Sequence, residues 1–246
     1  MRMHECEPSE GLRMLLAARH SCRAFLPRQV PQSLVRAVLE DAQRTPSWCN
    51  TQPWQVVVTA GAETLRLSDR LMDCVRGGSG GYDIDPPAHY EGIYQQRRRG
   101  AGFALYDSVG IAHDDADARI GQALENFRFF GAPHVVVVTS EAALGPYGYV
   151  DCGGYVTTLL LAAQSRGLAT IAQASVAGYS DAVREALGLP DTRHVVCAVA
   201  LGYPDREHPV NAFRTDRTPL SEVADLRGFH ADTGVVLQQS ADVRPE

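Results

Sequence analysis

Runs of β-branched apolar residues mark the expected strands of this chain. WQVVVT at 54–59, HVVVVT at 134–139 and HVVCAVAL at 194–201 are short, valine-rich segments. Such segments are typical of buried β-strands. Further strands are expected at 168–174 and, more weakly, at 234–237, so the pattern predicts about four or five strands.

The segments between these strands show the periodicity of apolar residues that is typical of helices. The first helix is expected at 10–19, and the next at 32–44, opened by Pro31. A long apolar helix is expected at 151–166, ended by Gly167, and a short one at 181–187. Strands separated by helices in this way predict a layered α/β or α+β domain.

Residues 77–118 are the least regular part of the chain. They contain GGSGG at 77–81, DPP at 85–87 and RRR at 97–99. A glycine- and proline-rich insertion followed by helical sequence is typical of a lid or substrate-side flap. The sequence HDDAD at 113–117 lacks the spacing of a metal motif, and acidic residues that open a helix explain it better.

Composition narrows the class of protein. A chain of 246 residues, 45% of them hydrophobic, is long enough for one domain with its own core. We see no membrane-spanning run and no leader pattern, so a cytoplasmic protein is expected. A net charge of −6 argues against a nucleic-acid partner. The six cysteines form no Cys-x-x-Cys pair, so reduced thiols are expected and a metal site is not.

The basic residues carry the first candidate chemistry. All 23 are arginine, which excludes a catalytic lysine and a Walker-type phosphate loop. In the segment 19–23 (RHSCR), Arg19, Ser21 and Arg23 share one side if the chain is extended. Two guanidinium groups around a hydroxyl suit a phosphate and an adjacent polyol. The alternative is that both arginines are solvated surface residues.

The second candidate is the polar loop PSWCNTQPW at 46–54. The side-chain amides of Asn50 and Gln52 both donate and accept hydrogen bonds, as the edge of a heteroaromatic ring requires. Trp48 offers a face for stacking or packing, whereas Trp54 begins a strand and is expected in the core. The alternative is a proline-rich connector whose tryptophans fill the core.

The glycine run at 77–81 matches a catalytic motif in its residues. GGSGG fits the G-x-S-x-G nucleophile elbow, which requires a strand before Ser79 and a helix after it. Pro86 and Pro87 follow instead, so a flexible glycine loop is favoured and a serine hydrolase is a remote alternative. No G-x-G-x-x-G follows a strand, so a Rossmann site is not expected.

Together these motifs resemble the FMN-dependent nitroreductase family over most of the chain. The similarity begins with Arg19-x-Ser21-x-Arg23-x-Phe25 and includes Pro46-Ser47-x-x-Asn50-x-Gln52-Pro53-Trp54. It continues through APHV at 132–135, the helix from Asp151, GLAT at 167–170, LGYP at 201–204 and RTDRTPLSEV at 214–223. Trp48-Cys49 and the stretch 94–111 look most like the nitrobenzoate-reductase type.

The resemblance implies an α+β, three-layer fold in which a mixed, mostly antiparallel sheet is flanked by helices. A single domain over 1–246 is implied, with a lid at about 77–118. Two chains would form an interwoven homodimer, with FMN at the interface and an embracing segment from about 214. NADH or NADPH would reduce FMN, and a nitroaromatic or quinone-like acceptor would be reduced in two-electron, ping-pong steps.

The resemblance also assigns residues to the cofactor. The first segment would approach the phosphate, ribityl chain or pyrimidine edge, together with arginines near the C-terminus, and the 46–52 loop would come from the partner chain. Arg128 would lie near the pyrimidine, and the backbone of 172–174 would face the ring N5 edge, with no side-chain role for Ala174. Trp48 would also form part of the substrate pocket wall. The predicted cofactor-binding residues are Arg19, His20, Ser21, Arg23, Pro46, Ser47, Trp48, Asn50, Gln52, Arg128, Gln173, Arg214 and Arg217.

Other interpretations stay open. A flavoenzyme of the same fold could fragment flavin, remove halogen or oxidise peptide azolines, and a flavin-binding protein could lack turnover. The scheme requires no side-chain acid or base, so none is named. Arg97, Arg98 and Arg99 are expected on a solvated face, and the alternative is that one attracts a carboxylated substrate.

Overall fold

The computed structural model describes residues 7–229 of the chain. Residues up to Arg214 belong to one compact unit, and those from Thr215 belong to a second. In the second unit, the described residues contain one short 3-10 helix, Leu220–Glu222. The strand predicted at 234–237 lies outside the described residues.

A four-stranded sheet forms the centre of the first unit. Each of its three strand pairings is antiparallel. The four strands predicted from the apolar runs before residue 202 are confirmed, each to within two residues at either end. In spatial order the strands are β1 (Trp54–Ala60), β2 (His134–Glu141), β4 (Arg193–Gly202) and β3 (Ala169–Gln173).

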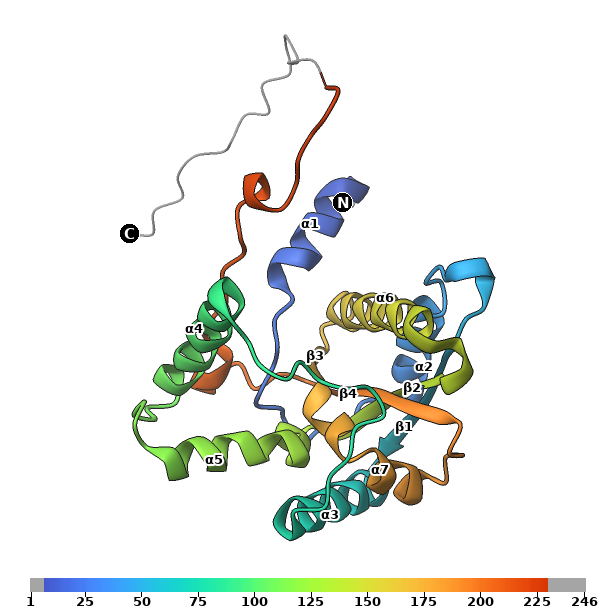
Figure 1. The fold of residues 1–246 in the computed structure, drawn as a ribbon, viewed down its shortest axis with the longest axis vertical. Coiled ribbons are helices and arrows are strands. Elements are labelled where there is room, and N and C mark those ends of the chain that lie inside the picture. The colour runs from blue at the N-terminus through green and yellow to red at the C-terminus, as the bar shows by residue number, and fades with distance from the viewer. Residues whose placement is uncertain (1–6, 230–246) are drawn as a thin grey trace, which may run out of the picture. The chain divides into compact units, whose positions relative to one another are not determined.

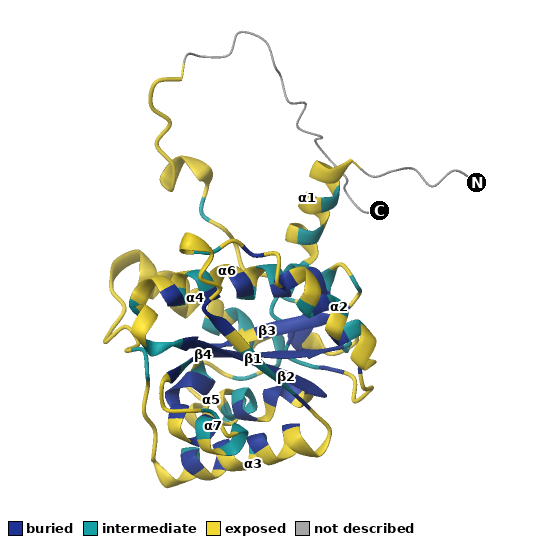
Figure 2. Ribbon diagram, turned by 90° about the vertical axis from the view of Figure 1, so that its right-hand side faces the viewer, coloured by how far each residue is buried: buried dark blue, intermediate teal, exposed yellow. Residues whose placement is uncertain are grey.

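Helices cover both faces of this sheet. On β2, successive side chains point to opposite faces. Val136 and Val138 pack in one apolar cluster, and Val135 and Val137 pack in the other. Figure 2 shows helices on both sides of the sheet, so the three-layer α+β prediction is confirmed. The first cluster contains residues of α2 (Gln32–Ala42) and α6 (Gly145–Gln164), and the second contains residues of α3 (Ala62–Gly77) and α7 (Ser180–Leu187).

Two helices differ from the prediction. Helix α6 begins at Gly145, so the expected start at Asp151 was wrong by six residues. Gly145 has a φ of 56°, and the next residue, Pro146, occupies the first turn, where proline is well tolerated. Helix α3 was not predicted, although its buried residues Leu67, Leu71 and Cys74 follow one another at helical spacing.

The irregular region 77–118 contains a glycine loop followed by α4 (Gly92–Ser108) and the start of α5 (Ala116–Leu124). The Asp115 carboxylate accepts the Ala118 N–H at 2.9 Å, which confirms that the acidic run caps a helix. Neither helix has a buried residue, and in the view of Figure 1 both lie to the left of the sheet.

The chain at 81–83, at the end of the glycine run, is tied to the segment after β3, to α7 and to the start of β4. The Gly81 N–H donates to Gly178 O at 2.8 Å. The Asp83 carboxylate accepts a bond from Arg184 and a second, at 2.8 Å, from the Val195 N–H. Motion of a lid, if it occurs here, must therefore begin after residue 83. The lid itself stays a prediction.

Candidate functional site

The segment 19–25 runs along the free edge of β3. The Cys22 N–H donates to Thr170 O at 3.0 Å, and Ser21 forms a parallel bridge with Thr170. Cys22 is fully buried, whereas Ser21 and Arg23 are half-buried. Alternate residues therefore face opposite sides, as the extended conformation predicted.

Asn211, which was not predicted, holds the other end of this segment. Its Oδ1 accepts the Arg23 N–H at 2.7 Å, and its Nδ2 donates to Ala24 O at 2.9 Å and to Asp205 O at 2.8 Å. The Arg23 guanidinium turns back to Ser21 O at 3.3 Å. A buried asparagine that bonds mostly main-chain groups carries no sequence signal of its own.

Basic side chains gather beside the segment. His20, Arg206 and Arg214 line a cavity of about 370 Å³. Burial lowers the pKa of His20, and the positive charges of Arg214, Arg19 and Arg206 lower it further, against the bond from its Nδ1 to Ala18 O. The imidazole is thus neutral at pH 7, with guanidinium groups around it, and this environment attracts an anion. We call the three guanidinium groups of Arg19, Arg206 and Arg214, with the neutral His20 among them, the cation cluster.

Arg206 is the member of the cation cluster that sequence reasoning missed. Its one signal is its place two residues after the LGYP motif at the end of β4. Arg217 was predicted to join the same group but belongs to the second unit. There its Nη1 donates to Thr215 Oγ1 at 3.0 Å and to Asp216 O at 2.9 Å. Its phosphate role stays a prediction.

The loop 46–53 has an unusual backbone. Cys49, Asn50 and Gln52 have φ values of 51°, 56° and 47°. A residue other than glycine in this left-handed region costs about 1–3 kcal/mol, so its surroundings must hold it there. Part of the hold is local, because Ser47 Oγ accepts the Gln52 N–H at 2.9 Å.

Some side chains of this loop are exposed, and one, that of Gln52, is hydrogen-bonded within the chain. Pro46, Trp48 and Asn50 are exposed; Trp48 is 57% exposed and lies edge-on to Tyr147, with ring centroids 4.1 Å apart. Gln52 is engaged within the chain: its Oε1 accepts from Gln43 Nε2 at 3.0 Å, and its Nε2 donates to Asn50 O at 3.3 Å. Gln52 therefore braces the loop, and its contact with a cofactor stays a prediction.

Trp54 follows the loop and is buried at the start of β1, as predicted. Its indole N–H donates to Gln43 Oε1 at 3.0 Å. Gln43 therefore bonds both Trp54 and Gln52 through the two ends of one amide. This residue was not predicted, and it ties the C-terminal end of the loop to the end of α2.

Gln173 does not present its side chain to the surface. It is 2% exposed, and its Nε2 donates to Asn126 O at 2.6 Å. Its neighbours Ala172 and Ala174 are exposed, so a ligand at this end of β3 would meet main-chain groups. Gln173 Oε1 and Ser175 Oγ are buried and have no hydrogen-bond partner within residues 7–229.

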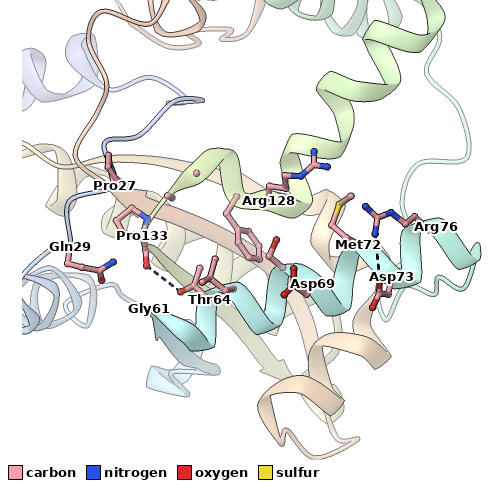
Figure 3. Close-up of a pocket in the computed structure, with 15 residues that line it drawn as sticks. Pro27, Gln29, Gly61, Thr64, Asp69, Met72, Asp73, Arg76, Arg128 and Pro133 are labelled. Atoms are coloured by element: carbon pink, nitrogen blue, oxygen red, sulfur yellow. Dashed lines mark hydrogen bonds and ion pairs between the residues drawn. The ribbon is translucent and has the colours of Figure 1, made fainter.

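Arg128 lines a different cavity, of about 740 Å³, which lies along α3 (Figure 3). Its Nη1 pairs with Glu125 Oε1 at 2.6 Å, and Arg76 and Asp73 lie near it at the same end of the cavity. The side chains that line the smaller cavity do not include Arg128. Its predicted place near a flavin pyrimidine stays a prediction.

Ser79 does not have the surroundings of a nucleophile elbow. It is exposed in the turn after α3, so a helix precedes it where the motif needs a strand. The structure therefore favours the glycine-loop interpretation.

The cysteines of the described chain are free thiols. Burial raises the pKa of Cys22 and Cys152 to about 11 and that of Cys197 to about 12. Protonated, buried thiols of this kind behave as small apolar residues. Between residues 7 and 229 no three His, Cys, Asp or Glu side chains are grouped to bind a metal. Over the same range no helix is long and apolar enough to cross a membrane.

Comparison with known proteins gives consistent matches. The family model described as the Nitroreductase family matches residues 16–203. The 4-nitrobenzoate reductase of Nocardioides sp. (strain LMS-CY) is 38% identical over 216 residues, which cover 86% of this chain and 87% of that protein. Nitroreductase NfnB of Mycolicibacterium smegmatis is 36% identical over 221 residues, 87% of this chain and 92% of that protein.

A solved structure agrees with these matches. The crystal structure of the FMN-dependent nitroreductase NfnB from Mycobacterium smegmatis in complex with NADPH superposes with a TM-score of 0.86. The two chains are 35% identical, and the match covers 89% of this chain and 99% of that one.

Proposed function

Because the chain belongs to the nitroreductase family, we propose that it is an FMN-dependent oxidoreductase that reduces nitroaromatic compounds with NADH or NADPH. Quinone-like compounds belong to the same class of proposed acceptors. The relative from Nocardioides is named for 4-nitrobenzoate, and the NfnB structure contains NADPH. These two compounds are therefore the acceptor and donor to test first.

The observation that carries this proposal is the cation cluster beside the free edge of β3. Guanidinium groups recognise phosphate through paired, charge-assisted hydrogen bonds. At the C-terminal end of β3, Ala172 and Ala174 are exposed, so a ligand there would meet main-chain groups, and the buried Gln173 Oε1 and Ser175 Oγ lack hydrogen-bond partners among the described residues. A phosphate-bearing molecule with a polar ring edge, such as FMN, fits this donor set.

We assign the phosphate of FMN to Arg19, His20 and Arg214, with Arg206 beside them. Ser21 and Arg23 would contact the neighbouring ribityl chain, and the backbone at Gln173 and Ala174 would meet the ring. In the proposed dimer, the partner copy would contribute its own loop. The further predicted contacts are those of Pro46, Ser47, Trp48, Asn50, Gln52, Arg128 and Arg217.

FMN, when bound, supplies the redox chemistry by accepting a hydride from the nicotinamide and passing two electrons to the acceptor. The residues of the chain bind and orient. Fixed guanidinium groups near the ring would stabilise negative charge that develops there. Trp48 offers a flat face to an aromatic acceptor. We propose no side-chain acid or base.

A homodimer is the second part of the proposal. Helix α1 (Pro8–Ala18) has no buried residue, and its Leu12, Met14 and Leu16 are exposed. Uncovered apolar side chains at this density are typical of an interface, and a second copy is the most common partner. In the second unit, Leu220, Val223 and Phe229 are exposed as well. Sedimentation equilibrium would distinguish two copies from one.

We also propose a cytoplasmic location. The five described cysteines are free thiols, which are typical of a reducing compartment. The nicotinamide donors are also abundant there.

The direct test is steady-state oxidation of NADPH by 4-nitrobenzoate with the FMN-loaded protein. We expect two-electron reduction products, nitroso and then hydroxylamine. Oxygen-dependent loss of FMN without acceptor reduction would favour a flavin-fragmenting enzyme of the same fold. Bound FMN with no NADPH oxidation by any acceptor would favour a flavin-binding protein without turnover.

A further inference from the structure

We propose that Asp151 is a positioning residue, which holds the loop 46–53 in its strained conformation against helix α6. The inference rests on the proposed function, because that function assigns this loop to the cofactor. Nothing in the sequence motifs gives Asp151 a role of its own. The structure places it at the middle of a surface of α6 that the loop lies against.

This surface is a single stripe of the helix. Gly148, Asp151, Gly154 and Thr158 are separated by three, three and four residues, so they lie on one face of α6. Thr45, just before the loop, donates its hydroxyl to Thr158 Oγ1 at 2.9 Å. The stripe therefore contacts the chain on the N-terminal side of the loop.

Two glycines let the helix approach closely. A Cβ atom added at Gly154 would lie 3.3 Å from Thr45 Cγ2. One added at Gly148 would lie 2.6 Å from Ser140 Oγ and 3.8 Å from Pro53 Cβ. The two ends of the loop, Thr45 and Pro53, thus rest on α6 on either side of Asp151.

Asp151 supplies the polar contact at the centre. Its Oδ2 and Oδ1 lie 3.1 Å and 3.3 Å from the Trp48 main-chain nitrogen, so the carboxylate accepts that N–H. A hydrogen bond to a charged acceptor is stronger than one between neutral groups. The bond fixes Trp48 directly before Cys49 and Asn50, two of the residues with left-handed backbone.

The strained backbone explains why such a contact is needed. Left-handed residues other than glycine persist only where the surroundings determine their conformation. Without Asp151, Cys49 and Asn50 could relax toward ordinary backbone, and the exposed side chains of Trp48 and Asn50 would change direction. Cofactor contacts made by the loop would weaken, while the helix beneath it would remain intact.

The test separates positioning from stability. Alanine is a better helix former than aspartate, so Asp151→Ala should leave the Tm of the FMN-free protein unchanged or slightly higher. We expect the Kd for FMN to rise about tenfold, as for loss of a hydrogen bond to a charged group. Asp151→Asn keeps an acceptor oxygen and should recover most of the affinity. Thr157→Ala, an exposed substitution on the same helix, is the matched control.

A second readout needs no cofactor. Hydrogen exchange of the amides of residues 48–52 should become faster in Asp151→Ala and stay unchanged in Thr157→Ala. If the unmodified protein takes up no FMN, the proposed function fails, whatever the exchange shows. If it binds FMN and Asp151→Ala binds equally well with unchanged exchange, the positioning role is overturned. A fall in Tm parallel to the fall in affinity, without recovery in Asp151→Asn, would overturn it as well.

Discussion

The segment 19–25 and the loop 46–53 are both assigned to the cofactor, but different interactions hold them. The first is held by main-chain bonds, from the Cys22 N–H to Thr170 O and from the Asp205 N–H to Ala24 O, together with the side chain of Asn211. The loop is held mainly by side chains, those of Asp151, Gln43 and Arg193. Hydrogen bonds between main-chain groups survive most substitutions, whereas a hydrogen bond made by a side chain is lost when that one residue is replaced. Single changes around the loop should therefore alter it more than single changes around the first segment.

The strongest hold on the loop is the buried guanidinium of Arg193, which is 6% exposed. Its Nη2 donates to Pro53 O at 3.1 Å and to Thr139 O at 2.9 Å. Arg193→Met would leave both carbonyls buried without these donors, so we expect the free energy of unfolding to fall by roughly 3 kcal/mol. Urea denaturation measures this. The exposed Arg13→Met is the control, and an equal effect of the two substitutions would contradict the comparison.

Asn211 tests the first segment in the same way. Asn211→Ala removes the bonds to the Arg23 N–H and to Ala24 O, while the main-chain bond from Cys22 to Thr170 remains. We expect a loss of about 2 kcal/mol in the free energy of unfolding, smaller than for Arg193→Met. A larger loss than that of Arg193→Met would show that side chains dominate both segments.

Trp48 tests what the loop presents to the acceptor. It is exposed and contacts Tyr147, so Trp48→Ala should leave the Tm unchanged. The loss of one aromatic contact should raise KM for 4-nitrobenzoate about threefold, with little change in kcat. Tyr147→Leu removes the neighbouring ring but keeps Trp48, so it is the matched control. An unchanged KM would remove Trp48 from the pocket wall.

A prediction on pH concerns His134, whose side chain holds a main-chain N–H just after the segment 19–25. Its Nε2 accepts the Val30 N–H at 2.9 Å, and its Nδ1 donates to Thr59 O at 3.3 Å. Burial lowers its pKa from 6.5, although the bond to Thr59 opposes this. Near pH 6 the unfolded chain therefore binds more protons than the folded chain. The stabilisation that His134 contributes is complete above pH 6.5 and is lost as the pH falls through the pKa of His134 in the folded chain.

The urea midpoint should therefore fall between about pH 7.5 and pH 5, where His134 becomes protonated in the unfolded chain. His134→Gln cannot titrate and should show a smaller fall over the same interval. Equal falls in both proteins would assign the pH dependence to other groups.

The strands and the extended conformation of the segment 19–25 were predictable because their signals are local. Alternate valines of β2 pack on opposite faces of the sheet, and the residues around Cys22 alternate as an extended chain does. The groups that hold the segments were not predictable. Asn211 and Arg193 act across long sequence separations and mostly on main-chain groups, which leave no residue pattern. Gln43 acts locally, on two side chains 9 and 11 residues away, but one glutamine after a helix is not a recognisable motif. The start of α6 was missed because its first residues include two glycines and a proline.

The most direct test of the account is the visible spectrum of the purified protein, recorded before and after anaerobic NADPH and again after 4-nitrobenzoate. The account predicts a flavin spectrum that bleaches with NADPH and returns when the acceptor is added. A flavin spectrum that NADPH leaves unchanged would contradict the proposed reaction. A protein that stays colourless after FMN is added would contradict the assignment of the cation cluster and the loop to that cofactor.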